Sequence, residues 1–238
     1  MNKTVLITGS TSDIGHATAR LFASNNYDVY LHYHNNLDEA KKIKEELEDD
    51  FNIKCYILKA DITSEEEVKE MFSNISNLDC LINNAALAID NHYLDKTANE
   101  FNKVIETNLT GTFLVTKYAS KVMNKGIIIN VSSNNAINDN SPISMDYDAS
   151  KAGIISLTHN FAKALAPDIR VNAVAPGWVL TSSVKEMDPK FLEEEKRRIL
   201  LDRIAFPEDI ANVIYFLASD KASYINDEII RIDGGLKW

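Results

Sequence analysis

The chain has 238 residues, of which 45% are hydrophobic and 25% are charged, and this composition is typical of ordinary folded domains. It excludes a disordered chain, a collagen-like chain and a small scaffold held by disulfides. The net charge of −10 disfavours nonspecific binding to nucleic acid, because the phosphate backbone would be repelled.

The two cysteines, Cys55 and Cys80, and the five histidines show no spacing typical of a zinc site, so we expect no bound metal. No apolar run approaches the roughly 18 residues that a membrane span needs, and the first residues lack the apolar core of a signal peptide. We therefore expect a cytoplasmic protein that does not bind a membrane.

Seven short segments rich in β-branched residues alternate with longer helical patterns along the chain. They cover residues 4–8, 29–33, 53–58, 78–82, 127–131, 169–175 and 228–232. Most are apolar throughout, as expected for parallel strands that helices cover on both faces. The pattern predicts an α/β fold: a doubly wound (Rossmann), mainly parallel seven-stranded sheet in three layers, within a single domain over residues 1–238.

The first predicted strand runs into the sequence TGSTSDIG, residues 8–15, and then into a helical pattern over residues 14–25. A glycine turn at a helix N-terminus presents N–H groups and the positive end of the helix dipole, so it can bind a pyrophosphate. A plain strand-to-helix turn would also explain the glycines. A carboxylate at Asp13 would oppose a pyrophosphate, and we expect it instead to cap the following helix.

Ser132 and Ser133 follow the predicted strand 127–131, at the sheet edge where doubly wound folds bind ligands. A hydroxyl there can bond a substrate carbonyl. Asn108 belongs to the inward stripe of a helix with a 3.6-residue period, together with Phe101, Val104, Ile105, Thr112 and Val115. A buried amide needs partners, so Asn108 is consistent both with a bonded core residue and with one that holds a water.

Tyr147 and Lys151 stand four residues apart at the start of a helical pattern that runs to Ala166, so they share a helix face. Lowering the tyrosine pKa from about 10 by about 3 units takes roughly 4 kcal/mol, which one ammonium at about 4 Å supplies at an effective dielectric near 20. The pair therefore can act as an acid and its electrostatic partner, although the same spacing occurs by chance in many helices.

One segment interrupts the alternation of strands and helices. Residues 181–203 lie between Pro176-Gly177 and a helix that begins near Pro207. Asp188 has the residue type of an N-cap and Pro189 that of a first helical position, so a short helix is predicted. We expect an inserted lid; its helix is equally consistent with a substrate cover and with a solvated surface helix.

Taken together, these ordered motifs resemble the short-chain dehydrogenase/reductase family along the whole chain, most closely its bacterial 3-oxoacyl-acyl-carrier-protein reductase branch. The matching segments are TGSTSDIG (8–15), Asp61-Ile62, NNAA (83–86), IETNLTG (105–111), Ser133, YDASK (147–151), RVNAVAPGWVLT (170–181), FPEDIANVIYFLASD (206–220) and IDGG (232–235). Asp13 and Ala86 stand where the family usually has glycine, and both changes are expected to crowd the cofactor site.

The resemblance implies a catalytic group of four residues. Tyr147 would donate a proton to the substrate carbonyl oxygen, which Ser133 would hold. Lys151 would lower the tyrosine pKa and bind the nicotinamide ribose, while Asn108 would keep a water that links Lys151 to solvent.

The resemblance also implies the cofactor contacts. Gly9, Ile14 and Gly15 would contact the pyrophosphate, Asp61 and Ile62 the adenine, and Asn84 and Ala85 the ribose region. The nicotinamide end would lie against Pro176, Gly177, Val179 and Thr181, with Val179 and Thr181 on the carboxamide side.

The residues after the second predicted strand, His32 to Asn36, include no carboxylate to accept from a ribose 2′-hydroxyl. NADP(H) is therefore favoured over NAD(H), with His34 and Ser12 as the expected neighbours of the 2′-phosphate. Because a protonated histidine holds a phosphate better, NADPH affinity is expected to fall from pH 6 to pH 8.

A 3-oxoacyl thioester carried by acyl carrier protein is the favoured substrate, and a small ketone, sugar or pterin-like carbonyl is the alternative. An acidic carrier needs a basic patch near the site mouth, for which Lys121, Lys125 and Arg170 are candidates. A nonenzymatic nucleotide-sensing relative is disfavoured because Tyr147 and Lys151 are both present. The resemblance also implies a homotetramer, with a homodimer as the alternative.

Overall fold

The computed structural model describes residues 2–237, in which seven strands form one fully parallel sheet in the order β3-β2-β1-β4-β5-β6-β7. The strands are β1 (Thr4–Ile7), β2 (Asp28–Tyr33), β3 (Cys55–Lys59), β4 (Cys80–Asn83), β5 (Gly126–Val131), β6 (Ile169–Pro176) and β7 (Ile229–Ile232). The predicted strands and the doubly wound fold are confirmed, with strand ends shifted by one or two residues.

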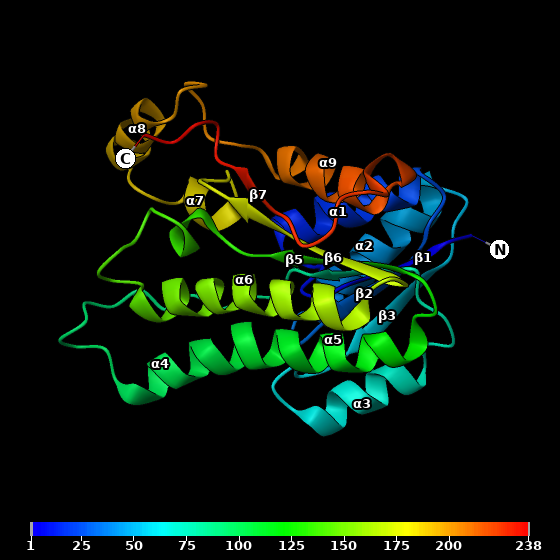
Figure 1. The fold of residues 1–238 in the computed structure, drawn as a ribbon. Helices are drawn as coiled ribbons and strands as arrows, with labels where there is room; N and C mark the ends of the chain where they lie inside the picture. Colours follow the sequence, from blue (N-terminus) through cyan, green and yellow to red (C-terminus); the bar gives the residue numbers. More distant parts are fainter. Residues whose placement is uncertain (1, 238) are drawn as a thin grey trace.

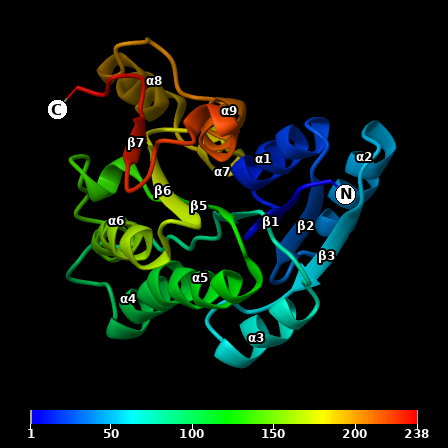
Figure 2. The ribbon, with the colours of Figure 1, turned by 45° about the vertical axis from the view of Figure 1, so that its right-hand side comes forward.

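Helices cover both faces of the sheet and give the three predicted layers (Figures 1 and 2). One face carries α1 (Asp13–Ser24), α2 (Leu37–Asp50) and α9 (Pro207–Ala218); the other carries α3 (Glu65–Ser73), α4 (Ala98–Ile105), α5 (Gly111–Val122) and α6 (Met145–Leu165). Two short helices, α7 (Ser182–Lys185) and α8 (Pro189–Arg198), fill the segment after β6. The predicted helix at Pro189 is present, with Asp188 as its N-cap.

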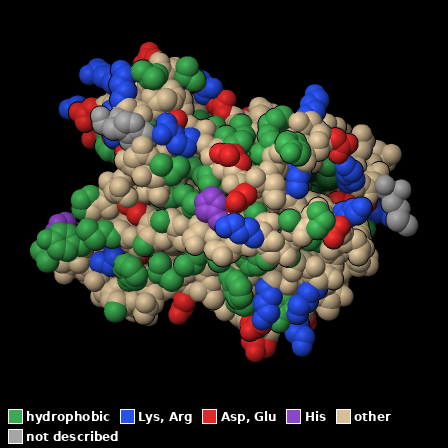
Figure 3. Space-filling view, viewed as in Figure 1, with side chains coloured by type: hydrophobic (Ala, Val, Ile, Leu, Met, Phe, Trp, Pro, Cys, Tyr) green, Lys and Arg blue, Asp and Glu red, His purple; other side chains and the backbone are tan. Residues whose placement is uncertain are grey.

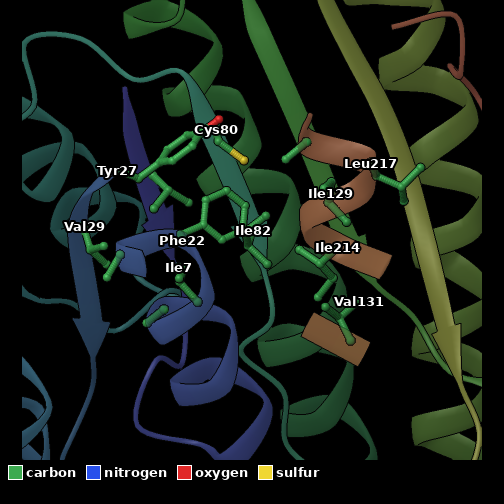
Figure 4. Packing of buried hydrophobic residues seen from close by; sticks show 14 of the residues in the cluster. Ile7, Phe22, Tyr27, Val29, Cys80, Ile82, Ile129, Val131, Ile214 and Leu217 are labelled. Carbon is green, nitrogen blue, oxygen red and sulfur yellow. The ribbon is translucent and has the colours of Figure 1, made fainter. Parts of the chain in front are cut away.

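The core consists of two clusters because successive side chains of a strand point to opposite faces of the sheet. Val5 and Ile7 of β1 lie in the cluster under α1 and α9, whereas Leu6 lies in the cluster under α3 and α5. Figure 4 shows the first cluster, in which Phe22 of α1 packs among Ile7 and Ile82. Both faces of the strands are therefore buried, as their apolar sequences predict.

A row of buried polar side chains crosses the sheet and fixes α6 on it. Asn83 and Asn130 are register partners on β4 and β5, and Asn83 Nδ2 donates to Asn130 Oδ1 at 2.8 Å. Asn130 Nδ2 in turn donates to Thr158 Oγ1 of α6 at 2.9 Å. Buried amides are stabilising only when bonded, so this row sets how α6 lies relative to the end of β5.

The predicted regular helix through Asn108 is wrong in one respect. A π-helix over Glu106–Thr110 separates α4 from α5, so the turn around Asn108 is wider than a 3.6-residue period allows. Phe101, expected on the inward stripe, is 38% exposed, whereas Asn108 is fully buried. A prediction from periodicity assumes a regular α-helix. It takes no account of the hydrogen bonds of the Asn108 side chain, which the wider turn accommodates.

Within residues 2–237, none of the helices combines the length and the apolar character needed to cross a bilayer.

Candidate active site

A cleft of about 920 Å³ lies at the carboxyl ends of the central strands. This is the place where doubly wound sheets bind ligands. Its lining includes most of the residues singled out by sequence: Gly9, Ser12, Ile14, His34, Asp61, Ile62, Asn84, Ala85, Tyr147, Lys151 and Thr181. A second cavity, of about 970 Å³, lies beside the edge strand β3 and includes none of these residues.

The glycines of the first loop allow two loops to approach each other closely. Gly9 has φ +60°, and a Cβ built on it would lie 2.8 Å from Ala85 Cα. A Cβ on Gly15 would lie 2.5 Å from the Gly9 carbonyl oxygen. Neither position accepts a side chain without movement of the backbone, so the glycines allow the first loop, the N-terminus of α1 and the loop after β4 to pack closely together and form a glycine cradle.

Hydrogen bonds of the Ser12 hydroxyl hold this loop in its conformation. Ser12 is the N-cap of α1; its Oγ accepts from Gly15 N at 3.2 Å and donates to the Gly9 carbonyl at 2.9 Å. Asn84 Nδ2 donates to the carbonyl oxygens of Thr8 and Gly9 and to Ser12 Oγ. Ser12 lines the cleft, but its hydroxyl is already bonded, which weakens the expectation that it contacts a 2′-phosphate.

The prediction that Asp13 caps α1 is wrong. Ser12 is the cap, and the Asp13 carboxylate accepts from Ser182 Oγ at 2.9 Å and from Ser182 N at 3.0 Å. Burial would raise the pKa of Asp13, but these two bonds outweigh it and the pKa is lowered. The carboxylate thus ties α1 to α7 and is not part of the cleft lining.

The part of the cleft beside β2 and β3 contains a carboxylate that the sequence after β2 does not reveal. Asp61, at the end of β3, places Oδ2 3.8 Å from His34 Nε2. Its Oδ1 accepts from the N–H and the hydroxyl of Thr63. Burial opposes the shift, but the Thr63 bonds and the nearby His34 lower the pKa of Asp61.

His32 is a cleft residue that the sequence did not single out. Burial lowers its pKa to about 4, so the ring is neutral near pH 7. Its Nδ1 accepts from Gly9 N at 3.1 Å, and its Nε2 lies 3.1 Å from the Ala60 carbonyl, to which it donates in this tautomer. The ring therefore joins the glycine loop to the end of β3.

Tyr147, Lys151 and Ser133 meet where α6 crosses the end of β5. Lys151 is 1% exposed; its Nζ donates to the Val131 carbonyl at 2.8 Å and lies 5.4 Å from the centre of the Tyr147 ring. Ser132 Oγ donates to the Lys151 carbonyl at 2.9 Å, so its hydrogen is used on the backbone of α6. Ser133, the expected choice of the two serines, is the one that interacts with the phenol.

Lys151 was expected to lower the pKa of Tyr147, but burial of the phenol outweighs this effect. Burial raises the pKa of Tyr147 to about 12, and the Ser133 hydroxyl only partly opposes this shift. Burial also lowers the pKa of Lys151 to about 7. The sequence-based expectation left out desolvation, which is the largest cause of the pKa shifts of both side chains.

Both polar groups of the Asn108 side chain form hydrogen bonds within the protein. Oδ1 accepts from Leu87 N at 2.7 Å, and Nδ2 donates to the Leu87 carbonyl at 2.9 Å and to Ser150 Oγ at 3.0 Å. The amide thus joins the π-helix to the loop after β4 and to α6. A water held by Asn108 would need its main-chain carbonyl, which already accepts from Thr112 Oγ1 at 2.7 Å.

The remaining residues singled out by sequence lie beside the cleft without lining it: Gly15, Asn108, Ser133, Pro176, Gly177 and Val179. Val179 is buried in the core, and Gly177 N donates to the Ile232 carbonyl. Ala86 lines the cleft, as expected. Cleft residues that were missed are Thr11, Tyr33, Asn35, Asn36, Ala60, Thr63, Leu87, Ala88, Lys103, Glu106, Thr107, Val131 and Ser183. Most of them follow a strand end or lie within five residues of Asn108, which is the signal that could have identified them.

Within a single chain, the basic residues that were expected near the mouth of the cleft lie elsewhere. Lys121 ends α5, Lys125 precedes β5, and Arg170 lies at the start of β6. They therefore lie at the amino ends of the strands, opposite the cleft. Arg170 also donates to the carbonyls of Ile225 and Leu217, which holds it within the fold.

The comparisons with known proteins agree with this geometry. The family model described as Enoyl-(Acyl carrier protein) reductase matches residues 9–237. The 3-oxoacyl-(acyl-carrier-protein) reductases of Aquifex aeolicus and Thermotoga maritima are 37% and 39% identical to this chain, each over 98% of it and 97% of the relative.

Solved structures are similar over almost the whole fold. A 3-oxoacyl-(acyl-carrier-protein) reductase from Brucella melitensis gives a TM-score of 0.92 at 27% identity, over 99% of this chain and 91% of the other. A dehydrogenase/reductase from Sinorhizobium meliloti gives 0.92 at 29% identity, over 98% and 94%. The chain therefore belongs to the short-chain dehydrogenase/reductase family, whose members are oxidoreductases that use a nicotinamide cofactor.

Proposed function

We propose that this enzyme reduces a carbonyl group to a secondary alcohol with NADPH, and that its substrate is a 3-oxoacyl thioester bound to acyl carrier protein. The observation that carries the proposal is the meeting of Tyr147, Ser133 and Lys151 at the end of β5, beside a cleft with an open glycine cradle. The 3-oxoacyl substrate is supported by the activity for which the two bacterial relatives are named.

A dinucleotide fits the residues of the cleft. Gly9 lines the cleft beside the N-terminus of α1, where backbone N–H groups favour a pyrophosphate. We assign the adenine end to Asp61 and Ile62, the ribose region to Asn84 and Ala85, and the nicotinamide side to Thr181 with the backbone around Pro176, Gly177 and Val179. The bound nicotinamide supplies the hydride.

Tyr147 is the proton donor in this proposal. With its pKa raised to about 12, the phenol is protonated at neutral pH and is ready to protonate the carbonyl oxygen as the carbonyl carbon accepts a hydride. The Ser133 hydroxyl holds the same oxygen. After the transfer, Ser133 and a charged Lys151 stabilise the tyrosinate.

Lys151 and Asn108 return the proton. Lys151 Nζ donates one hydrogen bond to the Val131 carbonyl. We assign its other N–H groups to the nicotinamide ribose and to a water. A lysine whose pKa is lowered to about 7 exchanges protons readily at neutral pH. Asn108 positions this path through its main-chain carbonyl and through its bond to Ser150, the residue before Lys151.

We assign cofactor choice to His34, which lines the cleft beside Asn35 and Asn36. A protonated His34 binds a 2′-phosphate, so NADPH affinity falls as pH rises from 6 to 8. A flat profile, or a preference for NADH at both pH values, contradicts this role. The Asp61 carboxylate, whose Oδ2 lies 3.8 Å from His34 Nε2, repels a phosphate at this position, and NAD(H) is therefore the alternative cofactor.

The segment over residues 181–203 acts as a lid in this proposal. It is tied to the cofactor side by Asp13 and Ser182, and to the substrate side by Arg198 NH2, which lies 2.9 Å from Asp139 Oδ1. A lid attached at both ends covers the nicotinamide when it closes.

We also propose a homotetramer, with a homodimer as the alternative. Figure 3 shows hydrophobic side chains gathered over the face formed by α4, α5 and α6. Phe113 of α5 is 41% exposed and stacks on Phe161 of α6, with ring centres 6.1 Å apart. Light scattering that gave only the mass of one chain would contradict this assembly.

The test of function is NADPH oxidation at 340 nm with a small acetoacetyl thioester and a panel of ketones, sugars and pterins. We expect the thioester to react fastest and Tyr147→Phe to lose at least a hundredfold in kcat, in line with the loss of a general acid. Tyr224→Phe is the matched control, because Tyr224 is fully exposed and lies outside the segments assigned to the site. Equal rates for wild type and Tyr147→Phe would eliminate the proposed acid.

A further inference from the structure

Ser133 is held by a side chain that neither the sequence motifs nor the proposed mechanism includes. Asn135 N donates to Ser133 Oγ at 3.2 Å, and Ser133 Oγ donates to Asn135 Oδ1 at 3.3 Å. Asn135 thus contacts the hydroxyl through two separate groups. It belongs to the short 3-10 helix Asn134–Ala136 that directly follows β5 and Ser133.

Behind Asn135 lies a buried carboxylate. Asp148, next to Tyr147 on α6, is 7% exposed; its Oδ1 accepts from Asn135 Nδ2 at 2.8 Å and its Oδ2 from Ser141 N at 2.9 Å. No lysine, arginine or histidine forms an ion pair with it among residues 2–237. Amide donors alone therefore hold this charge.

The carboxylate determines which way the Asn135 amide faces. An ionised carboxylate only accepts hydrogen bonds, so the NH₂ group of Asn135 must face Asp148 and the amide oxygen must face Ser133. Ser133 has a single hydrogen, which it gives to that oxygen. One of its two lone pairs accepts from Asn135 N, and the other is left for the Tyr147 phenol, with which Ser133 interacts.

We infer that Asn135 and Asp148 are positioning residues that act through Ser133. Asp148 orients the Asn135 amide, and Asn135 holds Ser133 Oγ in place while its hydrogen moves from the amide oxygen to the carbonyl oxygen of an arriving substrate. The inference rests on the proposed function, because it assigns these residues to the same reduction.

The first test is a double-mutant cycle on kcat with saturating NADPH. We expect Asn135→Ala to lower kcat about tenfold in the wild type and to have little effect in a Ser133→Ala background, because its target is then absent. Asn160→Ala is the control: Asn160 is exposed on α6, and its Nδ2 donates to the Ser156 carbonyl of the same helix without touching Ser133 or Asn135. Its effect should be under twofold in both backgrounds.

The second test exchanges the two side chains. Asp148→Asn allows the Asn135 amide to rotate by 180°, because its neighbour can then donate as well as accept. Asn135→Asp places two carboxylates side by side. Each change alone should therefore lower kcat. In the combined Asn135→Asp/Asp148→Asn variant, the amide at 148 accepts from Ser141 N and donates to the carboxylate at 135, which still accepts from Ser133. We expect kcat to recover to within about threefold of the wild type.

The outcomes separate this inference from the proposed function. If Ser133→Ala and Tyr147→Phe both react like the wild type, the proposed function fails. If Ser133→Ala is slow but Asn135→Ala lowers kcat equally in both backgrounds, Asn135 only supports the loop and the inference is overturned. Failure of the exchanged pair to recover activity, with a wild-type melting temperature, also overturns it.

Discussion

The two halves of the active site are built differently. The cofactor half consists of the loops over residues 9–15, 34–36, 61–63 and 84–88, which follow strand ends and are held mostly by backbone groups and uncharged side chains. The half that we assign to the substrate, called the substrate half below, consists of residues 88–97, 134–144 and 181–203. Buried or partly buried carboxylates hold it, among them Asp146 with Lys96, and Asp139 with Arg198.

This difference predicts which substitutions each half tolerates. The cofactor half depends on close approach of backbones, so it is sensitive to added volume at a glycine. The substrate half depends on paired charges in low-dielectric surroundings, so it is sensitive to removal of one partner and much less to replacement of both. Four substitutions or titrations test the contrast.

The largest effect is expected at the ion pair between Lys96 and Asp146. Lys96 Nζ lies 2.6 Å from Asp146 Oδ1, the two side chains are 5% and 0% exposed, and the carboxylate also accepts from Tyr147 N. Lys96→Met leaves a buried charge unpaired and should reduce the free energy of unfolding by about 3–5 kcal/mol. Urea denaturation measures this change.

The combined Lys96→Met/Asp146→Asn variant should regain most of the lost stability, since no charge is then left buried. The surface pair of Lys117 with Glu65 is the control, and Lys117→Met should have a far smaller effect, because both side chains are exposed. A double variant as unstable as the single one would show that packing, and not charge, holds residues 88–97.

The next effect is a dependence of stability on pH. Burial lowers the pKa of Lys151 to about 7 in the folded protein, whereas an unfolded lysine has a pKa of about 10.4. Between these values the unfolded chain binds one more proton, so stability rises with pH, by about 1.4 kcal/mol per unit, and the full cost of burying the charge is present below pH 7.

Unfolding free energies of wild type and Lys151→Met, measured from pH 6 to pH 9, isolate this contribution. Their difference should be constant near pH 6 and should change by about 2–3 kcal/mol toward pH 9 in favour of the wild type. A difference independent of pH would mean that Lys151 keeps its ordinary pKa when buried.

The cofactor half should respond most to Gly15→Ala. The added Cβ would lie 2.5 Å from the Gly9 carbonyl and 2.8 Å from Ser10 Cα, so the loop must shift away from the pyrophosphate position. We expect NADPH affinity, measured by fluorescence titration, to fall at least tenfold. Gly153→Ala is the control, because its Cβ would meet only the flexible end of Leu109. Unchanged affinity in Gly15→Ala would contradict the assigned cradle.

Sequence predicts the cofactor half well for a physical reason. Strand, glycine turn and helix are neighbours along the chain, so Gly9 and Gly15 reveal the cradle locally. Tyr147 and Lys151 are likewise joined by one helical turn. The loops after β2 and β3 are predicted less completely, because the approach of Asp61 to His34 depends on the pairing of two strands.

The substrate half could not be predicted in the same way. Asp13 and Ser182 are 169 residues apart, and Arg198 and Asp139 are 59 apart, so only the folded chain brings them together. The pKa of Tyr147 could not be obtained from spacing either, because burial, which helical periodicity does not report, determines its sign.

The smallest effect is expected at Asp13, which joins the two halves. Because its carboxylate is bound to Ser182 and does not line the cleft, Asp13→Asn should change NADPH affinity less than threefold. It should instead loosen α7, so that limited proteolysis within residues 181–203 becomes faster and the KM for the carbonyl substrate rises a few-fold. Ser182→Ala, which keeps the main-chain bond and loses the hydroxyl bond, should show about half of this effect. A gain in NADPH affinity above tenfold in Asp13→Gly would show instead that the carboxylate opposes the phosphates, and the link between α1 and α7 would then be incidental.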